Sequence, residues 1–470
     1  MKKLLLSFVV ALAASNFSIA QTQSYWLTTT FGGSPNGGTI DKVDPNGVTL
    51  SHVYDFIYAI GDNPYGNLVQ ASDGNVYGTT ENGGPSGSCV IFRYDPVNNI
   101  YTDVHDFYFA DGYIPYSGLV ESNGVLYGVT WDGGVNTGGV LYSYNIATGV
   151  YTDLHDFDSP TGDYPWGALT VANGKLYGMT TSGGSHGFGN IFCYDPSLFT
   201  YSVLHNLNDS TDGKNPYGSL LHAADGKFYG LTMEGGTNGV GTIFSLDASA
   251  LTFTTLYSFG TTSGCKPKAS LVQAPNGMMY GTASEGGLNS NGAVFSFDPS
   301  TSTYTDIHDL TLAEGKNPNG DLTLTPGGLL FGTAIFGGAN GGGTAFRLDP
   351  SNGAFNVICN FSGTWGANPY GGFNLVDLTL GIRDHSLADA SLSLFPNPAT
   401  NVITVTAIEP QENVSFIIRN SLGQEVMSWN ETHVDKNYRR EIGLEQLDAG
   451  IYFIEMKSAD KTLTKKFVKE

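Results

Sequence analysis

The sequence is poor in charged residues, and basic residues are the scarcer class. Only 14% of the residues are charged, and 21 Lys and Arg stand against 43 Asp and Glu, so the net charge is −22. The deficit lies in residues 21–378, which hold 9 Lys and Arg against 30 Asp and Glu. A field of this sign repels phosphate backbones and anionic lipid headgroups. It therefore argues against nucleic-acid and membrane-surface partners.

Cysteine and the common catalytic motifs are also scarce. The sequence has 4 cysteines, with no CxxC and no Cys/His cluster of zinc spacing, so neither a disulfide framework nor a zinc site is predicted. It has no HExxH, no phosphate-binding loop and no Ser/His/Asp elbow. No catalytic residue, no metal ligand and no cofactor is assigned. The acidity suits calcium, but no motif supports a calcium site.

Long apolar runs are absent beyond the first residues. Lys2 and Lys3 precede an apolar run over residues 4–14, and small residues lead to Ala20. This order is typical of a secretory signal peptide, here residues 1–20 with cleavage after Ala20. The run is shorter than the roughly 20 residues that span a bilayer, and no later run is longer. The sequence therefore predicts export and no transmembrane segment.

A repeat of 50 or 51 residues organises the chain. Its most regular landmark is a proline followed four residues later by Leu or Phe, at Pro64, Pro115, Pro165, Pro216, Pro267, Pro318 and Pro369. A period of this length indicates a propeller or a solenoid.

Each repeat contains four short runs with strand composition. In the unit that starts at Pro64 these runs begin near residues 68, 76, 90 and 100, and they are rich in aromatic and β-branched residues. Tight-turn signals such as Asp73-Gly74 join the first run to the second, and Asp95-Pro96 joins the third to the fourth. The longest link, such as residues 209–214, leads to the next unit. Each unit is therefore predicted to be a four-stranded blade.

The two ends of the repeat region decide between a ring and a rod. Residues 26–33 match residues 77–84, so the first unit lacks its first strand, and residues 369–378 supply one lone first strand. A solenoid would leave both fragments as unpaired edges. The sequence therefore predicts an all-β, seven-bladed propeller over residues 21–378, closed by pairing of its terminal strands.

The motifs of this region resemble a known family. Several short sequence motifs recur in a fixed order. Examples are Leu126-Tyr127-Gly128, Ile91-Phe92-Arg93-Tyr94-Asp95-Pro96 and Leu154-His155-Asp156-Phe157. They are similar to the Gloeo/Verruco tandem repeat of exported bacterial proteins and, distantly, to Kelch repeats. The resemblance implies export and surface display, and it implies no known reaction.

The tail departs from the repeat. Residues 379–390 are predicted to be a linker, and residues 391–470 a small Ig-like β-sandwich with strands such as 402–405, 414–418 and 451–454. Its motifs resemble the type A C-terminal sorting domain of type IX secretion in Bacteroidota, at Pro396, Asn397, Pro398, Gly423, Gly450, Tyr452 and Lys466. The resemblance implies the type IX machinery as a partner and an extracellular or cell-surface location. A carbohydrate-binding or fibronectin-like sandwich is the alternative.

Ligand candidates follow from the predicted topology. The residue after each proline should line one mouth of the central channel, the default ligand site of a propeller. Five of these seven residues are aromatic, which suits stacking on sugars or contact with a protein loop, although repeated rings also wedge between blades. The candidate ligand-binding residues are Tyr65, Tyr116, Trp131, Trp166, Tyr217, Lys268 and Tyr370.

Three functions remain open at this stage. The favoured one is a non-catalytic surface propeller that binds a glycan or an extracellular protein. A glycan-active hydrolase or lyase is the alternative, with Asp132, Glu234, Glu285 and Asp321 as candidate carboxylates, one of which should be indispensable for turnover. A structural envelope protein is the third. A histidine column, His105, His155, His205 and His308, is expected to pack between blades rather than to form a site.

Overall fold

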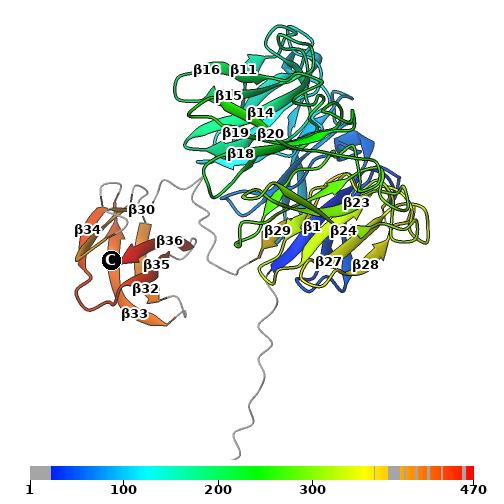
Figure 1. The fold of residues 1–470 in the computed structure, drawn as a ribbon. Helices are drawn as coiled ribbons and strands as arrows, with labels where there is room; N and C mark the ends of the chain where they lie inside the picture. Colours follow the sequence, from blue (N-terminus) through cyan, green and yellow to red (C-terminus); the bar gives the residue numbers. More distant parts are fainter. Residues whose placement is uncertain are drawn as a thin grey trace, which may run out of the picture.

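The computed structural model describes residues 23–364, 366–378, 392–395, 399–407, 411–420, 424–435, 438–457 and 462–469. Up to residue 378 these residues form seven antiparallel sheets arranged around a centre, each sheet a blade (Figure 1). The fold is the closed seven-bladed propeller that the repeat predicts. The predicted signal peptide (1–20) and linker (379–390) lie outside the described residues.

The first blade closes the ring. Its order is β29-β1-β2-β3, with β29 (Asn374–Asp377) from the end of the repeat region and β1 (Gln23–Thr29), β2 (Thr39–Val43) and β3 (Leu50–Asp55) from its start. Strands β29 and β1 run antiparallel, with Val376 opposite Ser24 and Leu375 opposite Tyr25. Neither end of the repeat region is left as a free edge, which protects both against edge-to-edge association.

The other blades repeat one pattern. The second to fourth comprise β4 (Val69–Gln70), β5 (Val76–Thr80), β6 (Val90–Asp95) and β7 (Ile100–Asp106); β8 (Val120–Ser122), β9 (Val125–Val129), β10 (Val140–Asn145) and β11 (Val150–Asp156); and β12 (Asp163–Pro165), β13 (Thr170–Ala172), β14 (Lys175–Ser182), β15 (Asn190–Asp195) and β16 (Thr200–Asn206). In the fourth blade both β12 and β13 pair with β14. Short 3₁₀ turns η1 (Tyr58–Ile60) and η2 (Phe109–Asp111) lead into the second and third blades.

The fifth to seventh blades comprise β17 (Leu221–His222), β18 (Phe228–Thr232), β19 (Thr242–Asp247) and β20 (Thr252–Ser258); β21 (Val272–Gln273), β22 (Met279–Ala283), β23 (Ala293–Asp298) and β24 (Thr303–Asp309); and β25 (Thr323–Leu324), β26 (Leu330–Ala334), β27 (Thr344–Asp349) and β28 (Ala354–Asn360). The residues just before β4, β8, β13, β17, β21, β25 and β29 line the central cavity described below, so these strands lie nearest the centre of the ring.

A glycine–aromatic pair sets the packing inside six blades. A glycine in the second strand faces an aromatic ring in the third, as Gly230 faces Phe244. A Cβ on Gly230 would lie 2.4 Å from Phe244 Cζ, so only glycine fits. The first blade differs, because Leu27 and Asp41 occupy the paired positions. Buried Asp41 accepts a hydrogen bond from Thr39 Oγ1 at 2.6 Å and lies 3.1 Å from His52 Nδ1.

Three blades carry on their outer strand an aspartate whose charged form is disfavoured. Burial, then repulsion from a second aspartate three residues along, raises the pKa of each to about 6. These groups are Asp103, Asp153 and Asp306. Because the folded pKa exceeds the unfolded value near 4, the charged form opposes folding. The free energy of unfolding is therefore higher near pH 4, where these carboxyls are protonated. It falls as the pH rises from about 4 through 6 and they become charged.

Replacing these three residues by asparagine is expected to stabilise the fold at neutral pH. The triple variant should melt a few degrees higher, a gain limited because the groups are partly solvated, and the gain should vanish near pH 4. Differential scanning calorimetry across pH measures it. The control is Asp298→Asn, since hydrogen bonds from Ser300 hold the pKa of Asp298 below its usual value and no gain is expected. A gain that persists at pH 4 contradicts the assignment.

The tail forms a separate two-sheet β domain. One sheet has the order β30-β31-β34, and the other β33-β32-β35-β36. Their bounds are β30 (Leu392–Phe395), β31 (Val402–Ala407), β32 (Gln411–Asn420), β33 (Glu425–Val434), β34 (Tyr438–Gly443), β35 (Gly450–Lys457) and β36 (Thr462–Lys469). Ile403 from the first sheet and Phe416, Ile454 and Phe467 from the second share one buried core. This is the small β-sandwich that the alternating sequence predicts.

Candidate ligand-binding site at the channel mouth

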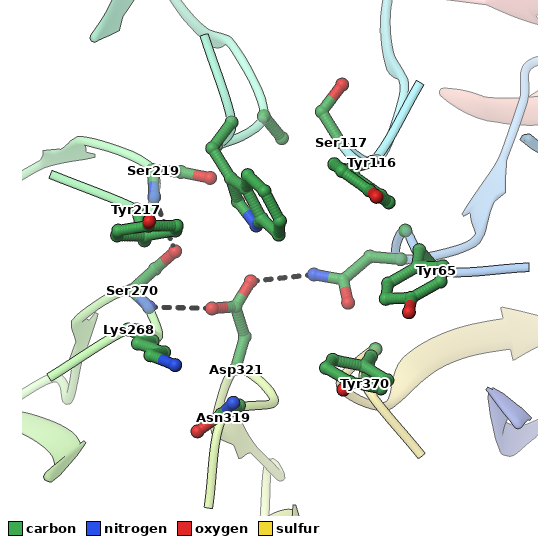
Figure 2. A pocket seen from close by; sticks show the side chains of 18 of the residues that line it. Tyr65, Tyr116, Ser117, Tyr217, Ser219, Lys268, Ser270, Asn319, Asp321 and Tyr370 are labelled. Carbon is green, nitrogen blue, oxygen red and sulfur yellow. Dashed lines mark hydrogen bonds between the residues drawn. The ribbon is translucent and has the colours of Figure 1, made fainter. Parts of the chain in front are cut away.

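A central cavity of about 410 Å³ opens where the first strands begin. Every blade contributes the residue that follows its repeat proline, namely Tyr65, Tyr116, Trp166, Tyr217, Lys268, Asn319 and Tyr370. Figure 2 shows the four tyrosines of this set around Asp321. The volume falls within the roughly 300–1,000 Å³ that is usual for small-molecule sites. Six of the seven predicted ligand-binding residues lie on this one cavity.

The five aromatic rings form a continuous wall. The ring centroids of Tyr370 and Tyr65 are 4.5 Å apart, those of Tyr65 and Tyr116 4.8 Å, those of Tyr116 and Trp166 4.2 Å, and those of Trp166 and Tyr217 4.9 Å. The rings are only partly buried, so each keeps a surface for a ligand. Burial raises the pKa of Tyr65 and Tyr116, which keeps their hydroxyls protonated.

The wall is open over two neighbouring blades. Lys268 lies at one side of the opening, with its Nζ 5.9 Å from the ring centroid of Tyr217. Asn319 follows, and its buried Oδ1 accepts no hydrogen bond from the described residues. Ile335 and exposed Phe336 line the cavity beyond it. The opening therefore combines a cation, an amide and an apolar edge, in contrast to the aromatic wall.

The floor of the cavity is a belt of hydrogen bonds. Asp321 Oδ2 accepts from Asn67 Nδ2 at 2.7 Å, and Asp321 Oδ1 accepts from the backbone N–H of Ser270 at 2.6 Å (Figure 2). Asn67 Oδ1 accepts from the N–H of Gly372 at 2.6 Å, and Ser270 Oγ from the N–H of Ser219 at 2.8 Å. The belt joins blades across the ring and fixes the polar groups that face a ligand.

Only one of the four candidate catalytic carboxylates reaches the cavity. Asp321 lines it, whereas Asp132, Glu234 and Glu285 do not. Glu285 lies 3.1 Å from Lys266 Nζ in a salt bridge, and Asp132 Oδ1 accepts from the next backbone N–H at 2.7 Å. These four carboxylates therefore do not meet as a pair at this cavity.

Trp131 lies outside the cavity lining, next to the wall. Its ring centroid is 6.1 Å from that of Tyr116 and 6.5 Å from that of Trp166. Tyr164, which the sequence analysis did not select, lies 5.2 Å from Trp131. Asn67 was missed as well, although it occupies a position where five other blades have Gly, Ala or Ser. Blade-specific polar or aromatic residues were the signal that could have found both.

The histidine column packs between blades. Each imidazole stacks on an aromatic ring of the next blade at 3.9–4.2 Å, in the pairs His105–Tyr151, His155–Tyr201, His205–Phe253 and His308–Phe355. Tyr54 and Tyr257 stack in the same way on Tyr101 and Tyr304. The column is therefore structural. Among the described residues no group of three or more His, Cys, Asp or Glu side chains is placed to hold a metal ion.

The predicted sorting residues are only partly described. Pro396, Asn397, Pro398 and Gly423 lie outside the described residues. Gly450 and Tyr452 begin β35, and Lys466 lies in β36. Tyr452 is buried, stacks on Phe467 at 5.6 Å and donates its hydroxyl to the carbonyl of Asp448 at 2.9 Å. Tyr452 thus anchors the turn that precedes β35. No helix in the described part of the chain is long and apolar enough to cross a membrane.

Solved structures support the fold. A protein described as a "putative 6-phosphogluconolactonase" from Bacteroides uniformis is 15% identical, with 76% of this chain and 100% of that chain covered and a TM-score of 0.54. A second such protein, from Bacteroides fragilis, is 14% identical, with 77% and 99% covered and a TM-score of 0.54. At this identity the likeness concerns the fold alone. No curated protein matches the sequence.

Family models assign both parts of the chain. The Gloeobacter/Verrucomicrobia repeat matches residues 14–223 and 172–382, and the secretion system C-terminal sorting domain matches residues 393–470. The second match implies interaction with the type IX secretion machinery and indicates secretion to the cell surface or the exterior. The chain thus belongs to the Gloeobacter/Verrucomicrobia repeat family and ends in a type IX sorting domain.

Proposed function

We propose that the propeller is a non-catalytic binding module that takes a glycan in its aromatic mouth. The observation that carries the proposal is the unbroken wall from Tyr370 to Tyr217 above a polar floor. Aromatic faces stack on the apolar faces of sugar rings, and the fixed carboxylate and amide of Asp321 and Asn67 suit sugar hydroxyls. After removal of the signal peptide (1–20), residues 379–390 would link this module to the sorting domain.

Glycan binding is preferred over binding of a protein loop because of the floor. Asp321 and Asn67 bind each other and the backbone, and both line the cavity, so their remaining hydrogen-bonding capacity is open to a ligand that enters it. A protein that contacts only the rim does not use these groups, whereas a sugar that enters the cavity can bind them through its hydroxyls. The experiment below distinguishes glycan binding in the cavity from protein recognition at its rim.

Removing the centre of the wall is expected to weaken binding strongly. Trp166 contacts the rings of both Tyr116 and Tyr217, so Trp166→Ala should weaken binding of the best glycan by about tenfold or more. A glycan array on the secreted chain identifies that glycan, and isothermal titration calorimetry measures its Kd. The matched control is Phe199→Ala, an exposed aromatic (77%) on the turn between β15 and β16.

The outcomes separate the candidate functions. Unchanged binding in Trp166→Ala, with a native melting curve, would remove the mouth as the site. A silent array together with a specific protein partner would replace the glycan by protein recognition. Turnover of a bound glycan that disappears in Asp321→Asn would favour the hydrolase alternative, since Asp321 is the carboxylate that lines the cavity.

A further inference from the structure

The residue before each repeat proline adopts a left-handed backbone. Its φ is 51–57° in all seven repeats, at Asn63, Ile114, Tyr164, Asn215, Lys266, Asn317 and Asn368. This region of φ/ψ space is strained for most side chains and least strained for glycine, asparagine and aspartate. The asparagine found at four positions therefore suits the conformation. The other three positions have the same conformation but a different residue.

The asparagines also join neighbouring blades. Each amide donates to the carbonyl at the end of the second strand of the preceding blade, at 2.8–3.1 Å. Asn63 Nδ2, for example, donates to Thr30 O. The fold thus uses asparagine both for its conformation and for its hydrogen bond. Another residue at this position lacks this hydrogen bond and adopts the same conformation with more strain.

Tyr164 occupies this position in the fourth blade. Its backbone is held on both sides, because its N–H donates to Gly138 O at 2.8 Å and its carbonyl accepts from Thr181 Oγ1 at 2.7 Å. The ring cannot donate to Trp131 O, the acceptor that corresponds to Thr30 O. Its hydroxyl makes no hydrogen bond with the described residues, and the side chain is only partly buried. The hydrogen bonds of the repeat therefore do not require a tyrosine here.

The ring of Tyr164 packs beside the ring of Trp131. The two ring centroids are 5.2 Å apart at 33°, and Trp131 in turn lies 6.1 Å from Tyr116 and 6.5 Å from Trp166. The column of Trp131 varies between blades, and Trp131 is its one aromatic residue, beside Thr30, Glu81, Thr181, Met233, Ser284 and Ile335. The aromatic residues of the two columns are adjacent. Together they extend the aromatic wall outward from the mouth across the boundary of the third and fourth blades.

We propose that Trp131 and Tyr164 form a second carbohydrate subsite, so that the ligand is a neutral polysaccharide chain that leaves the mouth over this boundary. The inference rests on the proposed glycan-binding function. Strain kept at a surface position marks function when folding does not require it. Neutral chains are favoured because Asp132 lies next to this subsite and the propeller holds 30 acidic against 9 basic residues, which repels anionic polymers.

The test compares chain lengths with Tyr164→Asn. The probes are cello-, manno-, xylo- and chito-oligosaccharides from the disaccharide to the hexasaccharide, titrated calorimetrically into the full secreted chain. Native protein should bind the hexasaccharide of the preferred series about tenfold more tightly than the disaccharide, and Tyr164→Asn should remove this gain while disaccharide affinity stays unchanged. Its melting temperature should not fall, since asparagine adopts this conformation with less strain and can donate to Trp131 O as in the other blades.

Lys266→Asn is the matched control. It places asparagine at the equivalent position of the sixth blade, beyond the aromatic wall. It should leave the dependence of affinity on chain length intact. Equal losses at all lengths in Tyr164→Asn, an unchanged hexasaccharide affinity, or a clear drop in its melting temperature would each overturn the subsite. If the native chain binds no glycan at all, both proposals fail. If Trp166→Ala abolishes binding while Tyr164→Asn changes nothing, the subsite alone fails.

Discussion

Val376→Asp is expected to open the propeller. Val376 lies in β29, the single strand that closes the ring, and its side chain is fully buried among Trp26, Ile40 and Phe56 of the first blade and Leu68 of the second. A carboxyl there has no partner and either stays charged or takes up a proton. The expected loss is about 4 kcal/mol or more, a large part of the roughly 5–15 kcal/mol that stabilises a domain.

The neighbouring residue provides the control for this prediction. Leu375 also lies in β29, but it points to the other face and is 41% exposed. Leu375→Asp should therefore change the melting temperature little, while Val376→Asp should lower it strongly and make the first blade sensitive to protease. Thermal denaturation and limited proteolysis of the secreted chain measure both. Similar melting of the two variants would mean that pairing of β29 contributes little to closure.

Loss of closure is also expected to abolish ligand binding. The cavity takes residues from every blade, including Tyr370, which lies shortly before the closing strand β29. The floor depends on closure as well, since the bond from Asn67 to Asp321 joins the second blade to the seventh. A chain that is folded within its blades but open as a ring would keep strand signals in circular dichroism and lose its affinity.

The sequence predicted the parts of the fold that local chemistry determines. The Asn-Gly turn at Asn123 and Gly124 has positive φ at both residues, 54° and 77°, as the tight hairpin requires. The turn aspartate Asp95 accepts hydrogen bonds from the N–H groups of Val97 and Asn98, as its place before a proline suggests. The repetition of these turn signals predicted the number and order of the blades. The incomplete units at the two ends predicted that the ring closes by pairing of the terminal strands.

The site was predictable only in outline. The column after the prolines follows from topology, and the structure places all of it on one cavity. The belt between Asn67 and Asp321 was not predictable, because these residues are 254 positions apart and meet only in the closed ring. Tyr164 was missed for a different reason. A residue before proline is expected to be extended, whereas backbone bonds to neighbouring strands hold this one left-handed.

Gly230→Ala is the second large expected loss. The added Cβ would lie 2.4 Å from Phe244 Cζ and within 3.0 Å of two further atoms of that ring, in the middle of a buried blade. The ring cannot move without displacing the neighbouring blade, since interiors are close-packed. The expected destabilisation is about 3 kcal/mol, measured by urea denaturation. Gly260→Ala is the control, because no atom lies within 4 Å of its Cβ position.

A second substitution tests whether the contact with the ring is the cause. Phe244→Leu removes the tip of the ring and should lose about 1–3 kcal/mol alone, but in combination with Gly230→Ala it should recover much of the loss. The first blade already has this arrangement, in which a larger residue, Leu27, faces a smaller one, Asp41. Positive coupling between the two substitutions is therefore expected. Additive losses would show that the strand backbone, rather than the ring, excludes the Cβ.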